Sequence, residues 1–403
     1  MKAEPNSGVA GFLRSPDFRT KIRGAAPHVE RFGHDALDGV LSWDDLAEVL
    51  ATGLFDVSKD LLFTRNRITA PDDGFSRLVP GRDGTVDREL VADRCNQLLN
   101  EGYTLTLARI DRRRPAVRSL CRDIERIIGD PVAANVYAVH EEAMASGPHC
   151  DPHEIIVLQL AGAKRWRIYP PDLSERHDTI VARTLNSPPT DVTAETCALD
   201  IILEAGDLLY LPRAWWHDPV AAGGPSLHLT IGLHTVSGGD FVREILSSGG
   251  YRGALRDAAA SDATDEQLGA LAAGVVETVR KELTVSLMRS VLNRRAIEAV
   301  PHSSFAVGPA TTEGTGERFA WVGSRRAVVR ATGHQLVVSS NNREIQIPAN
   351  MGVLLDQLQA CDVGADILEE IVGTDAVPFA HVTLRRLIEL GVVVRTHAPH
   401  APQ

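Results

Sequence analysis

Residues 147–169 read GPHCDPHEIIVLQLAGAKRWRIY, and residues 206–220 read GDLLYLPRAWWHDPV. Both stretches contain short runs of β-branched, aromatic and other apolar residues bounded by glycine or proline, which is typical of β-strands separated by turns. The strand candidates here and nearby are NVYAV (135–139), EIIVLQL (154–160), KRWRIY (164–169), DLLYLP (207–212) and LHLTIGLH (227–234). Because no long helical pattern lies between them, residues from about 131 to 236 are predicted to form an all-β barrel or jelly roll.

The sequence before this β-rich region mixes helices and strands. SWDDLAEVLATGLF (42–55) begins with a serine that can cap a helix and has apolar residues at helical spacing. Residues 86–110 are predicted to form a helix that stops at Gly102 and is followed by a strand. A second helix is predicted over residues 115–130.

The sequence after the β-rich region turns helical. In residues 262–287, leucines and valines recur three or four positions apart, so this apolar stripe is available to pack on the barrel or on a partner chain. The last part combines two strand candidates, three helical stretches and a final strand, an order that resembles a winged helix. The sequence therefore predicts an α+β multidomain chain with the parts 1–236, 237–300 and 301–403.

Composition restricts the class of protein. The chain has 403 residues, 44% of them hydrophobic and 24% charged, which is typical of a globular protein with two or three domains. No apolar run approaches the roughly 20 residues that span a bilayer, and the N-terminus lacks a secretory pattern, so no membrane partner is expected. Five scattered cysteines favour the cytoplasm over an oxidising compartment. A net charge of -11 disfavours direct DNA binding.

A candidate metal site lies in the quoted stretches. His149 and Asp151 are two residues apart, so in a strand their side chains point to the same face. His217 follows another strand-like segment of the same region and is the candidate third ligand. Two imidazoles and one carboxylate leave three positions open, as suits non-haem iron(II) that must also hold a co-substrate and dioxygen. A closed structural zinc site would need four protein ligands instead.

An isolated His-x-Asp pair occurs by chance in many proteins, so the surrounding residues must indicate whether this pair binds a metal. NVYAVHEEAMASGPHCDPHEIIVLQLAGAKRWRIYPP (135–171) and GDLLYLPRAWWHDPV (206–220) contain an Asn-x-Tyr strand, the His-x-Asp strand, a Gln-Leu-x-Gly-x-Lys-x-Trp-Arg-x-Tyr hairpin and a Gly-Asp-x-Leu-Tyr-x-Pro-Arg-x-x-x-His segment. In order and spacing, these motifs resemble the JmjC ribosomal oxygenases, a branch of the cupin superfamily. The resemblance implies a double-stranded β-helix followed by a helical dimerisation segment and a C-terminal winged-helix-like domain.

The resemblance also implies cofactors and their ligands. His149, Asp151 and His217 would hold Fe(II), and Lys164 would pair with the distal carboxylate of 2-oxoglutarate, with O2 as the second co-substrate. Tyr137 and Asn135 match positions near the co-substrate and the metal. The structural alternative for Lys164 is a surface lysine in a hairpin. For Tyr137 and Asn135 it is a strand pair that satisfies hydrogen bonds of the barrel.

Three further residues are candidates for contact with substrate. His153 departs from the family pattern and would lie on the face of His149 and Asp151 if the strand continues past Pro152. Trp216 precedes the third ligand, and core packing is its default explanation. His228 alternates with Thr230 and His234 along one strand, and one of the first two, with His228 as the substrate candidate, is expected to face the pocket.

The family implies hydroxylation of a side chain, with histidine or arginine favoured. The substrate would be a ribosomal protein or, as a variant, the precursor of a peptide natural product, and the protein is expected to be a homodimer in the cytoplasm. A JmjC-type N-methyl demethylase and a non-catalytic cupin and winged-helix ligand sensor are the alternatives. The chain has no evident reader module, which argues against the demethylase. It retains the complete triad with Lys164, which argues against the non-catalytic sensor.

Overall fold

The computed structural model describes residues 7–81, 84–140, 147–171, 194–248, 253–297, 317–322, 327–340 and 343–397. The chain divides into two compact units, Met1–His234 and Thr235–Gln403. The border lies two residues before the predicted end of the first part at 236. The further division into 237–300 and 301–403 falls inside the second unit and stays a prediction.

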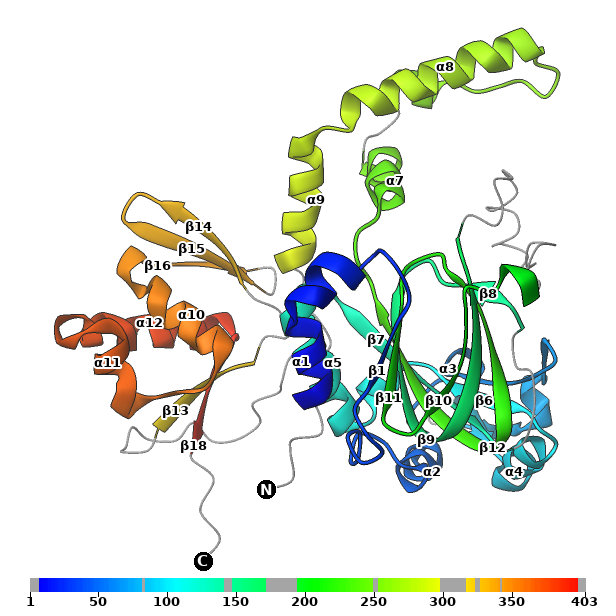
Figure 1. Ribbon diagram of the computed structural model, residues 1–403. Coiled ribbons are helices and arrows are strands. Elements are labelled where there is room, and N and C mark those ends of the chain that lie inside the picture. The colour runs from blue at the N-terminus through cyan, green and yellow to red at the C-terminus, as the bar shows by residue number, and fades with distance from the viewer. Residues whose placement is uncertain are drawn as a thin grey trace, which may run out of the picture. The chain divides into compact units, whose positions relative to one another are not determined.

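The first unit combines one large sheet with a few helices (Figure 1). Its helices are α1 (Ser7–Arg14), α2 (Trp43–Thr52), α3 (Val57–Asp60), α4 (Ala92–Asn100) and α5 (Pro115–Ile128), and a π-helical turn spans Phe18–Ile22. Its strands are β1 (His28–Arg31), β2 (Leu61–Arg65), β3 (Ile68–Thr69), β4 (Ser76–Pro80), β5 (Val86–Leu90), β6 (Thr104–Leu107), β7 (Val132–Val139), β8 (His149–Cys150), β9 (Glu154–Tyr169), β10 (Leu199–Glu204), β11 (Asp207–Leu211) and β12 (Trp216–Leu233).

Two long strands, β9 and β12, organise the jelly roll. They pair with each other along most of their length, while the other edge of β9 pairs first with β11 and then with β10. On the far side of β12 the sheet continues through β7, β6, β2 and β3, and β8 also pairs with β12. The jelly-roll fold predicted from the β-rich region is therefore confirmed.

Gly162 allows β9 to bend without a break. Its φ is +64°, and a Cβ at this position would lie 1.8 Å from the carbonyl oxygen of Pro225, so no other residue fits there without a shift of the backbone. The hairpin predicted from 154–160 and 164–169 is accordingly wrong, because both segments belong to the single strand β9. The register of β9 against β12 shifts between Ala221 and Ser226, where the paired strand accommodates the bend.

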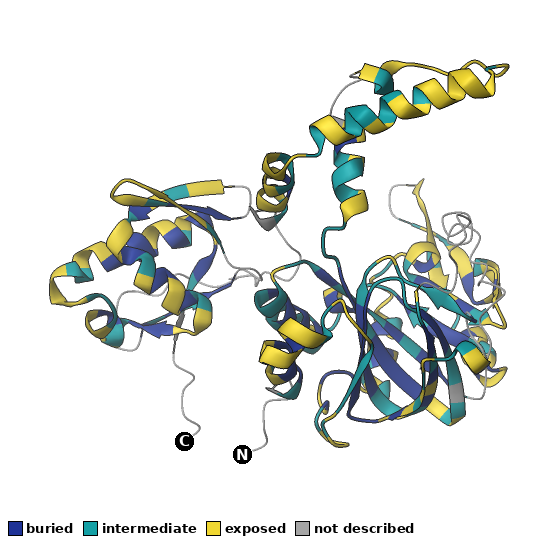
Figure 2. Ribbon diagram, turned by 45° about the horizontal axis from the view of Figure 1, so that its top comes forward, coloured by how far each residue is buried: buried dark blue, intermediate teal, exposed yellow. Residues whose placement is uncertain are grey.

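The two faces of the sheet bury different residues. Helices α1 and α5 cover the outer face, and α5 contributes Val117, Leu120 and Ile124 to the largest apolar core. Each such fully buried side chain stabilises the fold by about 1.5–3 kcal/mol. A smaller core of Ile155, Trp166 and other residues lies on the inner face of the barrel. Figure 2 shows the barrel strands as mostly buried.

The helices before the barrel follow their sequence signals, with one exception. Ser42 caps α2 in a reciprocal capping box with Asp45, and Gly129 ends α5 in the left-handed conformation. Residues 86–90, predicted as the first turns of a helix, instead form β5 in a hairpin with β4, so the helix begins only at Ala92. Pairing with β4 satisfies the backbone of this segment, and that partner is not visible in the local pattern.

In the residues that the structure describes, the second unit begins with a group of three helices and continues into a small α+β domain. The helices are α7 (Gly238–Ser248), α8 (Asp265–Glu282) and α9 (Val285–Ile297). The domain comprises β13 (Glu317–Trp321), β14 (Val328–Thr332), β15 (Gln335–Ser340), β16 (Arg343–Pro348), α10 (Gly352–Ala360), β17 (Val363–Gly364), α11 (Leu368–Val372), α12 (Val377–Leu390) and β18 (Val393–His397). Strands β14, β15 and β16 form one antiparallel sheet, and β13 lies between β17 and β18 in another. No helix in the described ranges combines the length and hydrophobicity of a membrane span.

Candidate metal centre

The three predicted metal ligands come together at one end of the barrel. His149 in β8 lies directly opposite His217 in β12, and Asp151 follows β8 immediately. The imidazole centroids of the two histidines are 4.3 Å apart, and Nε2 of His217 lies 3.6 Å from a carboxylate oxygen of Asp151. One potential ligand atom from each residue lies within 4.8 Å of the others, so the three side chains are placed to share one metal ion.

Backbone carbonyls fix the orientation of both imidazoles. Nδ1 of His149 donates to the carbonyl oxygen of Gly147 at 2.9 Å, and Nδ1 of His217 donates to that of Trp215 at 3.1 Å. A carbonyl can only accept, so the proton lies on Nδ1 in each ring and the lone pair of Nε2 is free to bind a metal. Metal-binding histidines usually donate their other ring N–H to a carbonyl or carboxylate oxygen in this way.

Burial prepares His217 further for metal binding. Desolvation and the neighbouring His149 lower the pKa of His217, while the negative charge of Asp151 opposes this shift. The imidazole is therefore neutral near neutral pH, which is the form that binds a metal. Two nitrogen donors and one oxygen donor are the set that suits Fe(II) with open positions, and thiolate donors of a structural zinc site are absent from this group of three.

Lys164 lies deeper in the barrel, on β9. Its side chain is buried, at 3% exposure, and lies two positions from Trp166 on the same face of the strand. The ring of Trp166 in turn lies 5.8 Å from that of His217. Among the residues that the structure describes, the ammonium group has no hydrogen-bonding or ion-pair partner, and burial lowers the pKa of Lys164 to about 8. A buried cation without a counter-charge is a site prepared for an anion.

Tyr137 and Asn135 lie on β7 and face the same interior. The ring of Tyr137 stacks on His228 with centroids 4.8 Å apart and an interplanar angle of 4°. Burial, together with the charge of Asp151, raises the pKa of Tyr137 to about 12. Oδ1 of Asn135 accepts a hydrogen bond from the backbone N–H of Arg109 at 3.1 Å, so this residue also anchors the loop after β6.

The three predicted substrate residues occupy different places. His153 is beside the metal centre, where its ring lies 4.8 Å from that of His234 and would collide with a Cβ at Gly232. Trp216 is 3% exposed and lies opposite Cys150, which leaves it little surface for substrate. His228 lies inside the barrel beside Tyr137 rather than at the opening. Their contacts with substrate stay predictions.

Sequence reasoning missed two residues of the interior, Trp166 and Gln159. Trp166 is 2% exposed and its ring lies edge-on to His228 at 5.7 Å. Gln159 lies directly opposite His228 in the pairing of β9 with β12 and is fully buried. The alternation that joined His149 to Asp151 would also have placed Trp166 beside Lys164, whereas Gln159 requires the cross-strand register.

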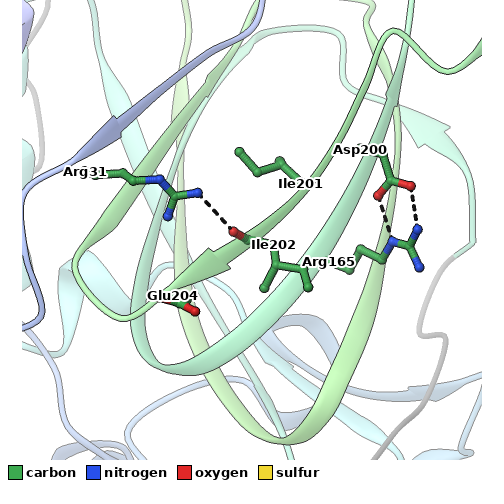
Figure 3. A pocket seen from close by; sticks show the side chains of 6 residues that line it. All are labelled: Arg31, Arg165, Asp200, Ile201, Ile202 and Glu204. Atoms are coloured by element: carbon green, nitrogen blue, oxygen red, sulfur yellow. Dashed lines mark hydrogen bonds and ion pairs between the residues drawn. The ribbon is translucent and has the colours of Figure 1, made fainter.

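A depression of about 800 Å³ lies elsewhere on the first unit, between β1 and β10 (Figure 3). Three of its charged residues already have partners: Arg165 makes two hydrogen bonds to Asp200, at 2.7 and 2.6 Å, and Arg31 donates to the carbonyl oxygen of Ile202. None of the three metal-centre residues lines it. We therefore assign the functional site to the barrel interior.

The region that holds the three candidate ligands is also similar to known proteins. Residues 111–241 match the JmjC domain family. Over 121 residues the chain is 36% identical to a Drosophila persimilis protein named bifunctional lysine-specific demethylase and histidyl-hydroxylase NO66, an alignment that covers 29% of this chain and 16% of that one. Over 127 residues it is 35% identical to ribosomal oxygenase 2 of Rattus norvegicus, covering 31% and 26%. The aligned part thus spans about a quarter or less of either relative.

Solved structures extend the likeness to almost the whole chain. The Escherichia coli ribosomal oxygenase YcfD has a TM-score of 0.52 at 16% identity, and the match covers 94% of this chain and 98% of that one. The same protein in complex with cobalt and succinic acid has a TM-score of 0.51 at 16% identity, covering 94% and 97%. At this identity the likeness establishes the fold. The part of the chain that matches the JmjC domain family, residues 111–241, thus contains all three residues of the candidate metal centre.

Proposed function

We propose that the protein is an Fe(II)- and 2-oxoglutarate-dependent oxygenase that hydroxylates a side chain of a protein or peptide. The observation that carries this proposal is the convergence of ligand atoms of His149, Asp151 and His217 within 4.8 Å of one another. In the same barrel Lys164 is buried, with no partner in the described part of the chain. The triad suits a metal with three open positions, and the lysine suits the distal carboxylate of a dicarboxylic co-substrate. The cobalt and succinic acid bound by YcfD agree with such a pair of ligands.

The chain's own residues would perform four tasks. The three triad residues would hold the iron, which with 2-oxoglutarate and O2 supplies the oxidising chemistry. Lys164 would fix one end of the co-substrate by charge, and Tyr137 would form part of the wall beside it. The apolar residues of the inner face exclude bulk water, which strengthens these electrostatic contacts.

Histidine and arginine side chains of ribosomal proteins are the favoured substrates. The names histidyl-hydroxylase and ribosomal oxygenase of the relatives support this class. One of those names also includes lysine-specific demethylase, so removal of an N-methyl group is the second candidate activity. A precursor of a peptide natural product is the alternative hydroxylation substrate. The mass of the product separates these activities, because hydroxylation adds one oxygen atom and demethylation removes one methyl group.

Reconstitution of the full chain tests the proposal. The protein is loaded anaerobically with Fe(II) and 2-oxoglutarate, exposed to O2 with candidate peptides, and assayed for succinate and for product mass. We expect succinate to form together with a product that has gained one oxygen atom, and Asp151→Ala to abolish both. Binding of 2-oxoglutarate without its consumption under any of these conditions would instead favour the ligand-sensor alternative.

We further propose that the second unit makes the protein a homodimer and ends in a winged-helix-like domain. No residue of α8 is buried, although Leu268 and Val276 are large apolar side chains with 43% and 67% exposure. The order of helices around the β14–β15–β16 sheet supports the winged-helix interpretation. A cytoplasmic location, in keeping with five cysteines that form no disulfide, belongs to the same proposal.

Light scattering on the full chain tests the dimer. We expect the wild type to have twice the mass of one chain and Val276→Glu to shift it toward the monomer. Val382→Glu, at a 49% exposed position of α12, is the matched control and should leave the mass unchanged. A monomeric wild type at micromolar concentration would contradict the proposal.

A further inference from the structure

His228 lies in the middle of β12 and forms a row with residues of both neighbouring strands. Its cross-strand partners are Tyr137 of β7 and Gln159 of β9, so all three side chains point to the same face of the sheet. That face is the interior of the barrel, because Trp166 of the inner core contacts His228 edge-on. The imidazole is 2% exposed.

The polar atoms around His228 are not satisfied within the chain. In the part of the chain that the structure describes, Nδ1 of His228 and Nε1 of Trp166 are buried without a hydrogen-bond partner, and the ammonium group of Lys164 has none either. Each unsatisfied buried group destabilises a protein by about 1–3 kcal/mol, so three together need an explanation.

The balance of donors and acceptors gives that explanation. The ammonium of Lys164 and the indole N–H of Trp166 can only donate, and a neutral imidazole carries one N–H donor. Among the described residues, the buried oxygen of this row without a hydrogen-bond partner is Oε1 of Gln159, whose amide nitrogen donates to Oγ of Ser226 at 2.9 Å. Donors therefore exceed acceptors, and an additional acceptor with more than one oxygen would satisfy them.

The charge state of His228 agrees with a donor role. Burial and the nearby positive charge of Lys164 lower the pKa of His228 well below its usual value. The imidazole is therefore neutral near neutral pH and contributes a hydrogen bond without adding a second positive charge. Such a pair, one cation and one neutral donor, matches a single carboxylate.

We propose that His228 donates a hydrogen bond to the distal carboxylate that Lys164 binds, and so selects dicarboxylic 2-oxo acids over monocarboxylic ones. This inference rests on the proposed function, and it assigns to His228 a role in co-substrate recognition in place of contact with the hydroxylated substrate. Stacking on Tyr137 holds the ring in position for that bond.

Three variants of the full chain separate hydrogen bonding from ring packing. His228→Phe keeps a ring to stack on Tyr137 and removes the N–H. His228→Asn and His228→Gln remove the ring and retain an amide N–H, close to the position of Nδ1 and Nε2 respectively. A role in packing alone predicts that Phe preserves ligand affinity and that the amides do not.

The measurement is the affinity of the anaerobic Mn(II)-loaded protein for 2-oxoglutarate and for 2-oxobutanoate, which lacks the distal carboxylate, by titration calorimetry. We expect His228→Phe to weaken 2-oxoglutarate binding by about 10- to 100-fold, as loss of a hydrogen bond to a charged group requires, and to leave 2-oxobutanoate unchanged. One of the two amide variants should restore a part of the loss. Thermal unfolding without ligand monitors the fold, and His228→Phe should not lower its midpoint.

Two results would overturn the inference while leaving the proposed function intact. In the first, His228→Phe binds 2-oxoglutarate as tightly as the wild type does. In the second, it loses affinity for both oxo acids to the same degree. Failure of the wild type itself to bind 2-oxoglutarate in the presence of Mn(II) would refute the proposed function, so the two failures are distinguishable.

Discussion

Replacing Lys164 with methionine should make the unliganded protein more stable and at the same time remove its affinity for 2-oxoglutarate. The lysine is charged at pH 7 and buried without a partner among the described residues. Burial lowers its pKa from the ordinary 10.5 to about 8. At about 1.36 kcal/mol for each pKa unit, the charged ammonium destabilises the fold by about 3 kcal/mol. Methionine has a similar length and no charge, so Lys164→Met should recover most of that amount.

The stability gained by Lys164→Met depends on pH because the pKa of Lys164 is lower in the folded chain than in the unfolded chain. Between about pH 8 and 10.5 the unfolded chain holds a proton on Lys164 that the folded chain has released. The stability of the wild type, relative to the variant, therefore rises with pH through this window. We expect the advantage of Lys164→Met to be complete below pH 8 and to disappear above about pH 10.5.

Urea unfolding followed by tryptophan fluorescence measures this effect, and titration calorimetry on the Mn(II)-loaded protein measures binding. Arg165→Met is the matched control, because Arg165 is the next residue of β9 but has a half-exposed side chain paired with Asp200. Its removal should change stability by about 1 kcal/mol or less and leave 2-oxoglutarate affinity unaltered. Lys164→Met should weaken that affinity by about a hundredfold or more, since an unpaired buried carboxylate costs about 3–5 kcal/mol.

One outcome would refute this reasoning directly. If Lys164→Met were less stable than the wild type at pH 7, and equally so at pH 10, the lysine would stabilise the empty barrel through packing or a partner. The prepared anion site would then not exist, and the argument for co-substrate binding at this residue would fail with it.

Three further substitutions test other parts of the structure. Asp151→Ala should weaken Co(II) or Mn(II) binding by about a hundredfold or more, measured by calorimetry, because it removes one of three ligands. Gly162→Ala should lower the urea midpoint by the equivalent of about 3 kcal/mol or more, since its Cβ would meet the carbonyl oxygen of Pro225 at 1.8 Å; an unchanged midpoint would disprove the strict need for glycine. Asp111→Asn should cost about 3 kcal/mol in thermal unfolding, because the buried carboxylate accepts from the N–H of Ala134 at 2.9 Å and pairs with a neighbouring arginine.

The sequence predicted the three clustered side chains of the candidate metal centre from strand alternation, for His149 and Asp151, and from the order and spacing of the motifs, for His217. His149 and Asp151 share a face by strand alternation, and the segment that carries His217 has a strand pattern of its own. The jelly roll followed from the same short strands. What the sequence could not supply was the pairing register, which depends on contacts between distant segments.

Two errors illustrate this limit. Residues 86–90 have helical neighbours in sequence, but they become β5 because β4 offers a partner for their backbone. The segments on either side of Gly162 look like two strands with a turn, but β12 runs beside both and keeps them in one strand. The placement of His228 opposite Gln159 and Tyr137 is of the same kind, since it follows from register and not from spacing.

The barrel must therefore be stable without a ligand and at the same time bury polar groups that need a ligand as their partner. Its outer face is an ordinary apolar core with α1 and α5, whereas its inner face buries Lys164, Trp166 and His228 with donors that find no acceptor among the residues that the structure describes. A ligand that supplies the acceptors binds only the folded state, so it stabilises that state by RT ln(1 + [L]/Kd). The outer core must be stable enough to keep the donors in place before the ligand arrives, because donors that relaxed toward one another would lose their preference for a carboxylate.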